Sequence, residues 1–117
     1  MIVYRLEHKE TGSGPYSAPG CLGCLVDHLC PQESDPVKSK EITQEHLFSW
    51  SAASEMVTFM KNPGRIENRG YVVHVLEVDD DTLQFPDGQV CFKNRLQTIG
   101  IHDPMDFIKL FSDGEFN

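Results

Sequence analysis

The sequence predicts an α+β domain with a small, mostly antiparallel sheet, two helices and a long irregular segment near the N-terminus. A strand-like alternation opens the chain, two segments have helical spacing, and a turn signal separates two short apolar runs. The resulting order of strand, loop, helix, strand, hairpin and helix contains no internal repeat and is typical of α+β proteins. We interpret residues 1–117 as a single domain, because a chain of 117 residues can bury a hydrophobic core without disulfides or a structural metal.

The first strand is predicted over residues 2–6, where Ile2, Tyr4 and Leu6 share one face of a period-two pattern. It ends at the glycines and proline of "HKETGSGPY". Residues 8–42 show no sustained periodicity and include the polar stretch "PQESDPVKSKEI", so we expect largely irregular structure there. A long irregular segment in a small domain usually serves function or faces a partner.

The segment "HLFSWSAASEMVTFMKNPG" predicts a helix that begins at Ser49 or Ser51, since a serine hydroxyl can accept from the first free amides. Asn62, Pro63 and Gly64 are expected to end this helix. Its apolar positions recur on one face: Ala52, Ala53, Met56, Val57 and Met60.

Three further elements follow towards the C-terminus. "GYVVHVLEV" (70–78) is apolar on both faces except for His74 and Glu77, which predicts a strand inside the sheet. "LQF", "PDG" and "QVCF" predict a hairpin in which Gly88 supplies the positive φ of a tight turn. "DPMDFIKLF" predicts a short helix with Asp103 at its cap and Pro104 at its first position.

Charge restricts the possible partners. Ten Lys and Arg residues against eighteen Asp and Glu residues give a formal net charge of −8. Such a surface repels the phosphate backbone that dominates nucleic-acid affinity, so we expect no direct nucleic-acid partner. It favours a protein partner with a basic surface, because opposite charges steer encounter. The same charge could also imitate nucleic acid towards an enzyme that binds it, or serve solubility alone.

The apolar residues are too scattered for a membrane protein. No run of about twenty apolar residues is present, so we expect no membrane partner. The N-terminus lacks the basic flank and long apolar centre of a secretory signal. We therefore expect a cytoplasmic protein whose cysteines stay reduced.

The stretch "CLGCLVDHLC" contains three of the four cysteines and raises the question of a zinc site. Cys21 and Cys24 have the spacing of one ligand pair, but His28 and Cys30 are closer together than the usual second pair. Other residues could complete such a site from elsewhere, namely His8, His46 or Cys91.

The alternative reading of this stretch is packing. It places an apolar stripe against the core, in which buried cysteines behave as small hydrophobes. The stripe consists of Leu22, Leu25, Val26 and Leu29. We favour this reading and predict no metal, with His28 at the boundary with solvent. A thioredoxin-like redox pair would need a preceding strand, and "GSGPYSAPG" does not have the pattern of one.

Arg5 on the first strand, "SWS" at 49–51 and Gln89 at the start of a late strand occur in a suggestive order. This order resembles the signature of ADP-ribosyltransferase-like domains, in which an Arg or His, a Ser/Thr motif and a late Glu or Gln line a dinucleotide cleft. The resemblance implies that Arg5, Ser49, Ser51 and Gln89 converge and bind NAD or a related nucleotide.

The chemistry of this reading is incomplete. Gln89 lacks the charge with which a carboxylate would stabilise an oxocarbenium-like transition state, so nucleotide binding without efficient transfer is expected. The simpler interpretation is that Arg5 is a surface strand residue, Ser49 and Ser51 are caps, and Gln89 belongs to the hairpin. We favour it and predict no catalytic residue and no cofactor.

"YRLEHKETGSGPY", "HLFSWSAASEMVTFM" and the pair "GYVVHVLEV" and "QVCF" carry a second resemblance. Together they resemble small uncharacterised phage and prophage proteins with a Tyr-Arg-x-Glu-His strand and a Gly-Pro-Tyr corner. "FSW" departs from the commoner Phe-Gly-Phe of that group. The resemblance implies an acidic accessory protein in the host cytoplasm that binds and inhibits a host or anti-phage defence protein, as an anti-CRISPR-like or host-takeover inhibitor.

Overall fold

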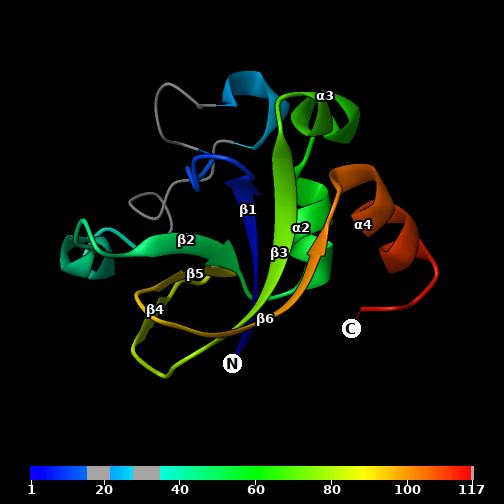
Figure 1. Ribbon diagram of the computed structural model, residues 1–117. Coiled ribbons are helices and arrows are strands. Elements are labelled where there is room, and N and C mark those ends of the chain that lie inside the picture. Colours follow the sequence, from blue (N-terminus) through cyan, green and yellow to red (C-terminus); the bar gives the residue numbers. More distant parts are fainter. Residues whose placement is uncertain (16–21, 28–34, 117) are drawn as a thin grey trace.

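The computed structural model describes residues 1–15, 22–27 and 35–116. Its six strands lie in the order β4-β5-β2-β1-β3-β6, and all neighbours are antiparallel (Figure 1). The strands are β1 (Ile2–His8), β2 (Leu47–Trp50), β3 (Tyr71–Val78), β4 (Thr82–Gln84), β5 (Gln89–Phe92) and β6 (Arg95–His102). The helices are α2 (Ala53–Phe59), α3 (Pro63–Asn68) and α4 (Pro104–Ser112), with 3-10 turns η1 (Gly23–Leu25) and η2 (Lys38–Glu41). The predicted α+β class is confirmed.

The sheet has an apolar core on each face, because successive side chains of a strand point to opposite sides. On one side, which we call the helical face, Tyr4 and Leu6 of β1 pack with Val73 and Val75 of β3 and with the helices. On the other side, the second face, the core consists of Val3, Leu76, Val78, Val90 and Phe92.

The three described helices cover the helical face, and in Figure 1 α2 is seen behind β3. Met56 of α2, Ile66 of α3 and Phe107 of α4 are fully buried there. Phe107 also stacks on Phe116, with ring centroids 4.6 Å apart. Burying one such side chain stabilises the folded state by about 1.5–3 kcal/mol. This apolar layer therefore fixes the positions of the helix termini and of the turns beside them.

β3 lies inside the sheet, between β1 and β6, as its apolar sequence predicts. Its side chains are buried on both faces, and only His74 and Glu77 are partly exposed. The register sets Arg5 opposite His74 on the second face. This pairing brings polar groups together in the interior.

The predicted start of the first helix is wrong. Residues 47–50 form β2, and α2 begins only at Ala53, without a side-chain cap. Ser49 is a strand residue whose Oγ donates to the Val90 carbonyl at 2.8 Å. Pairing with β5 and burial of Trp50 override the helical spacing. Three residues of the predicted face are buried, namely Ala53, Met56 and Met60, and Phe59 joins them.

The number of helices is also larger than predicted. Asn62 and Pro63 follow the end of α2 and at once begin α3, an additional helix beyond the two predicted. The Asn62 side chain accepts a hydrogen bond from the Arg65 amide at 3.2 Å, and Pro63 takes the first helical position. Asn-Pro therefore serves as a start signal here as well as a stop signal.

The remaining predicted elements are confirmed. β4 and β5 form the hairpin, and Gly88 has φ +94° in its turn. α4 begins at Pro104, and Asp103 takes the cap position with an extended backbone but makes no side-chain cap bond.

The irregular segment at 8–42 also agrees with the prediction, within its described part. Beyond the end of β1, that part contains only η1, η2 and an isolated bridge between Val26 and Met60. Leu22, Leu25 and Val26 are buried in the helical-face core, as the packing interpretation expects. None of the described helices is long and apolar enough to cross a membrane.

Candidate functional site

A surface pocket of about 200 Å³ opens beside α2, where the β4–β5 turn and the segment after η1 approach the helix. Its lining residues are Asp27, Trp50, Ser54, Glu55, Thr58, Phe59 and Asp87. We call it the acidic pocket, because three of these residues are carboxylates. The set combines acidic, hydroxyl and aromatic side chains drawn from four separate parts of the chain.

Trp50 and Phe59 give the acidic pocket an aromatic wall. Their ring centroids are 5.3 Å apart and the rings are tilted by 53°. Only 5% of Trp50 and 2% of Phe59 is exposed, so core packing holds both rings in place. The wall therefore presents a small apolar edge to the pocket, fixed in place by the core.

Glu55 projects from the first turn of α2, and its Oε1 accepts a hydrogen bond from Ser51 Oγ at 2.8 Å. The carboxylate also lies against Gly88, where a β-carbon would overlap Glu55 Oε2. Glycine at this turn thus supplies both the positive φ and the space for the carboxylate. Among the described residues, no Lys, Arg or His forms an ion pair with Glu55.

The other two carboxylates are held by neighbours. Asp87 accepts from the Gln89 amide at 3.0 Å and from Gln89 Nε2 at 2.6 Å, and Gln89 itself is buried. The Asp27 amide donates to the Phe59 carbonyl at 3.0 Å, which ties this segment to the end of α2. Asp27 Oδ1 lies 3.0 Å from Lys61 Nζ, but the Lys61 side chain is 54% exposed, so this ion pair is weak.

Positioned carboxylates beside an aromatic wall suit a cation that carries an apolar stem. A lysine ammonium or arginine guanidinium can be hydrogen-bonded by carboxylates while its methylene chain contacts the rings. The acidic pocket can therefore receive a basic side chain. Among the described residues, its lining includes no basic side chain.

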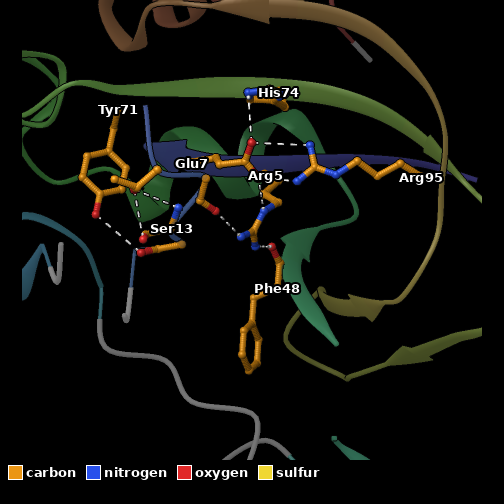
Figure 2. Close-up of polar contacts among 10 residues, drawn as sticks. Arg5, Glu7, Ser13, Phe48, Tyr71, His74 and Arg95 are labelled. Carbon is orange, nitrogen blue, oxygen red and sulfur yellow. Dashed lines mark hydrogen bonds and ion pairs between the residues drawn. The ribbon is translucent and has the colours of Figure 1, made fainter. Parts of the chain in front are cut away.

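A second polar cluster lies in the interior, on the second face of the sheet (Figure 2). Arg5 Nε donates to Glu7 Oε1 at 2.9 Å, and Arg95 donates from both terminal nitrogens to the same carboxylate. His74 Nε2 lies 3.4 Å from Glu7 Oε2. One buried carboxylate is thus shared by two guanidinium groups and an imidazole.

Arg5 also ties the β1–η1 loop and β2 to the sheet (Figure 2). Its Nη1 donates to the Phe48 carbonyl at 2.9 Å, and its Nη2 to the Gly12 carbonyl at 3.4 Å. A β-carbon at Gly14 would lie 3.2 Å from Arg5 Nη2, so the loop backbone passes close to the guanidinium. Arg5 is only 3% exposed, which favours a structural role.

Burial and charge shift the pKa values in this cluster. Burial alone would raise the pKa of Glu7, but hydrogen bonds and charges from Arg95 and Arg5 outweigh it, so the pKa lies below its ordinary value. Burial lowers the pKa of His74, and the two guanidinium groups add to the effect, although Glu7 opposes it. His74 is therefore neutral at neutral pH, and its buried Nδ1 has no partner among the described residues.

Comparison with known proteins gives one family. The family model described as the bacteriophage T4 Y00F protein matches residues 1–103. The chain belongs to this family. No curated protein and no solved structure matches the chain.

The match to the Y00F family covers the whole sheet and every lining residue of the acidic pocket. It supports the resemblance to small phage proteins. The Tyr-Arg-x-Glu-His motif as a mark of that group stays a prediction, although Arg5 and Glu7 of this motif both belong to the buried cluster. Gly14 of the Gly-Pro-Tyr corner contacts the same cluster.

The four residues of the ADP-ribosyltransferase-like reading are dispersed in this Y00F family protein. Arg5 lies opposite His74 on the second face, whereas Gln89 lies opposite Trp50 on the helical face. Ser49 is buried and bonded to the Val90 carbonyl, and Ser51 bonds Glu55 beside the acidic pocket. The geometry does not bring Arg5 and Gln89 into one cleft. Arg5 is moreover buried, not the surface strand residue of the simpler interpretation.

Two of the four cysteines, Cys24 and Cys91, lie in the described part of the chain. Cys21, His28 and Cys30 lie outside it, so the metal prediction for Cys21, Cys24, His28 and Cys30 stays a prediction. Cys24 is exposed in η1. Cys91 is buried in β5, and burial together with the charge of Asp87 raises its pKa to about 12.

Proposed function

We propose that this protein is a phage-encoded accessory protein that binds and inhibits a host or defence protein in the host cytoplasm. The observation that supports this most is the acidic pocket, in which three carboxylates adjoin an aromatic wall. The pocket would receive a lysine or arginine side chain from a basic surface of the partner. Membership of the Y00F family supplies the phage setting.

The overall charge supports the same kind of partner. A formal net charge of −8 attracts basic proteins over distances longer than a contact and raises the rate of encounter. It repels nucleic acid, so the proposal includes no direct contact with DNA or RNA. Long-range attraction is screened over about 10 Å at 0.1 M salt, so complex formation should be faster at low salt.

The pocket is also arranged for affinity. Glu55 and Asp87 each accept hydrogen bonds from neighbouring groups, and the rings of Trp50 and Phe59 are packed. Little conformational freedom remains to be lost on binding, which lowers the entropic cost of forming the contact. Charge-assisted hydrogen bonds then stabilise the complex more than neutral ones would.

The experiment is affinity capture from host cells under infection-like, low-salt conditions, with three baits. The first is the wild type, and the second is Glu55→Gln with Asp87→Asn, which removes two charges but keeps hydrogen-bond acceptors. The third is Asp80→Asn with Asp81→Asn, which removes the same charge in the exposed turn after β3. We expect the first and third baits to capture the same protein, and the second to retain at least about tenfold less, the effect of 1.4 kcal/mol.

The captured protein is then assayed for its own activity with and without the three proteins. The wild type and the turn variant are expected to inhibit it, and the pocket variant to inhibit much less. Absence of any captured partner at low salt would contradict the proposed binding function. Equal capture by the pocket variant would contradict the role of the pocket alone.

A further inference from the structure

The outer edge of β6 is a long sheet edge that no described strand covers. β6 has eight residues and pairs with β3 on one side, and no strand among the described residues pairs with its other side. The opposite edge strand, β4, has only three residues. A short edge is a common protection against unwanted pairing, whereas a long edge presents a row of backbone donors and acceptors to another strand.

Apolar side chains are concentrated along this edge. In the described part of the chain, six large hydrophobic residues are exposed, and four of them lie on β6 or at the start of α4. Their exposed fractions are 62% for Leu96, 53% for Ile99, 56% for Ile101 and 50% for Met105. Grouped exposed hydrophobic side chains mark an interaction surface more often than scattered ones do.

The edge is complementary to itself in charge and in apolar character. Between Arg95 and His102 there is no Asp or Glu, although the chain has eighteen of them. Lys93 and Arg95 stand at one end of the strand, and Asp103 follows the other end. An antiparallel pair of identical strands therefore brings the basic end of each beside the acidic end of the other.

We propose that β6 pairs antiparallel with β6 of a second copy of this chain, so that one sheet continues across a two-fold symmetric dimer. In the register that this charge pattern favours, Lys93 lies opposite Asp103 of the second copy, and the two-fold axis passes between Thr98 and Thr98 of the second copy. Gln97 then lies opposite Ile99 of the second copy, and this pair occurs twice. Strand addition of this kind uses main-chain hydrogen bonds for affinity and side-chain pairs for register.

A second copy fits this edge better than a strand of a basic partner. A basic strand finds no carboxylate along Arg95–His102, whereas the acidic pocket beside α2 offers three. The dimer edge and the acidic pocket are formed by different residues. The dimer is therefore independent of the proposed inhibitory function.

Sedimentation equilibrium of the full chain over a concentration series tests this proposal. The wild type is expected to rise from 13.2 kDa towards twice that mass. Ile101→Lys places a charge in the paired edge and should shift the midpoint of dimerisation at least about tenfold upwards in concentration, equivalent to 1.4 kcal/mol. Val37→Lys, at an apolar residue 77% exposed outside β6, serves as the matched control and should dimerise as the wild type does.

A second variant tests the register. Ile99→Lys alone should weaken dimerisation, and Gln97→Glu combined with Ile99→Lys should restore it, because each new glutamate lies opposite the new lysine of the second copy. Thermal unfolding of the monomeric variants verifies that the fold is intact. A wild type that stays at 13.2 kDa at every concentration, or an Ile101→Lys variant that dimerises unchanged, would overturn the proposal. Failure of the double variant to restore the dimer would overturn the register.

Discussion

Arg5 and Glu7 stand two residues apart on β1, and Arg5 Nε donates to Glu7 Oε1 across 2.9 Å where only 3% and 9% of their side chains is exposed. Residues at this spacing point to the same side of a strand. The strand alone therefore places the side chains of Arg5 and Glu7 next to each other. The surrounding structure completes it with Arg95 and His74 and closes it with the loop at Gly12 and Gly14.

Breaking this cluster should be costly. Glu7→Gln leaves Arg5 buried without its counter-charge, and we expect the free energy of unfolding to fall by about 3–5 kcal/mol in urea denaturation. Asp81→Asn is the control, because the pair of Asp81 with Lys93 is exposed and 3.9 Å long. That change should cost less than about 0.5 kcal/mol. Similar losses for the two variants would contradict a structural role for the Glu7 cluster.

The same cluster predicts acid sensitivity. The pKa of Glu7 is lowered from an ordinary value of 4.5, so its stabilising effect is complete above that pH and is lost as the pH falls through the folded-state pKa. The pKa of His74 is lowered from 6.5, so the unfolded chain takes up the proton first, and stability falls once the pH decreases below 6.5. In urea midpoints measured across pH, His74→Gln should flatten the decline that begins below 6.5. An unchanged slope would show that His74 does not cause it.

The turn at Gly88 predicts an effect on both stability and the acidic pocket. Gly88→Ala forces a side chain into a backbone with φ +94° and into the position of the Glu55 carboxylate, so we expect a loss of about 1–2 kcal/mol and a displaced Glu55. Gly64→Ala in α3 is the control, since Gly64 is helical and has space for a β-carbon. It should stabilise the protein by about 0.5–1 kcal/mol. Chemical denaturation of both variants measures this difference.

The two described cysteines should differ in reactivity. The thiolate is the reactive form, and burial raises the pKa of Cys91 to about 12, whereas Cys24 is exposed. An alkylating reagent at neutral pH should label Cys24 rapidly and leave Cys91 unlabelled until the protein is unfolded. Peptide mass spectrometry reports each site. Rapid native labelling of Cys91 would contradict its burial.

The metal prediction is tested by elemental analysis. We expect no stoichiometric zinc on Cys21, Cys24, His28 and Cys30, because the two cores supply a folded structure without it. Loss of zinc together with loss of far-ultraviolet circular dichroism on adding a chelator would contradict this. Mutation of Cys21, Cys24 and Cys30, followed by comparison of His28, His46 and Cys91, would then identify the ligands.

Several elements of the fold could be predicted from short stretches of sequence, because each such stretch contains the pattern that specifies the element. The alternation at Ile2–His8, the two-sided apolar run of β3 and the Pro-Asp-Gly turn each specify one element without reference to the rest. The local pattern at β2 favours a helix start, because these four residues become a strand only by pairing with β5. β6 gave no clear alternation, since bulges opposite β3 interrupt its period.

The candidate site could not be predicted from the sequence. Asp27, Glu55 and Asp87 share no motif and are separated by about thirty residues each, and only packing of α2 against the hairpin turn brings them together. The Arg5–Glu7 pair follows from its spacing on β1, but the partners His74 and Arg95 follow from strand register, which a single sequence does not reveal. A signal for the pocket was present only in the combination of a lone tryptophan with the "PDG" turn.

We propose that the acidic pocket receives a basic side chain, and Trp50 allows a direct test because it is the one tryptophan of the chain and lines the pocket. The measurement is a titration of tryptophan fluorescence with a short peptide that contains one arginine, and with the same peptide containing neutral citrulline. We predict a saturable change with arginine, a much smaller change with citrulline, and loss of the arginine effect in Glu55→Gln with Asp87→Asn but not in Asp80→Asn with Asp81→Asn. No saturable change with arginine, or equal changes with arginine and citrulline, would contradict the claim.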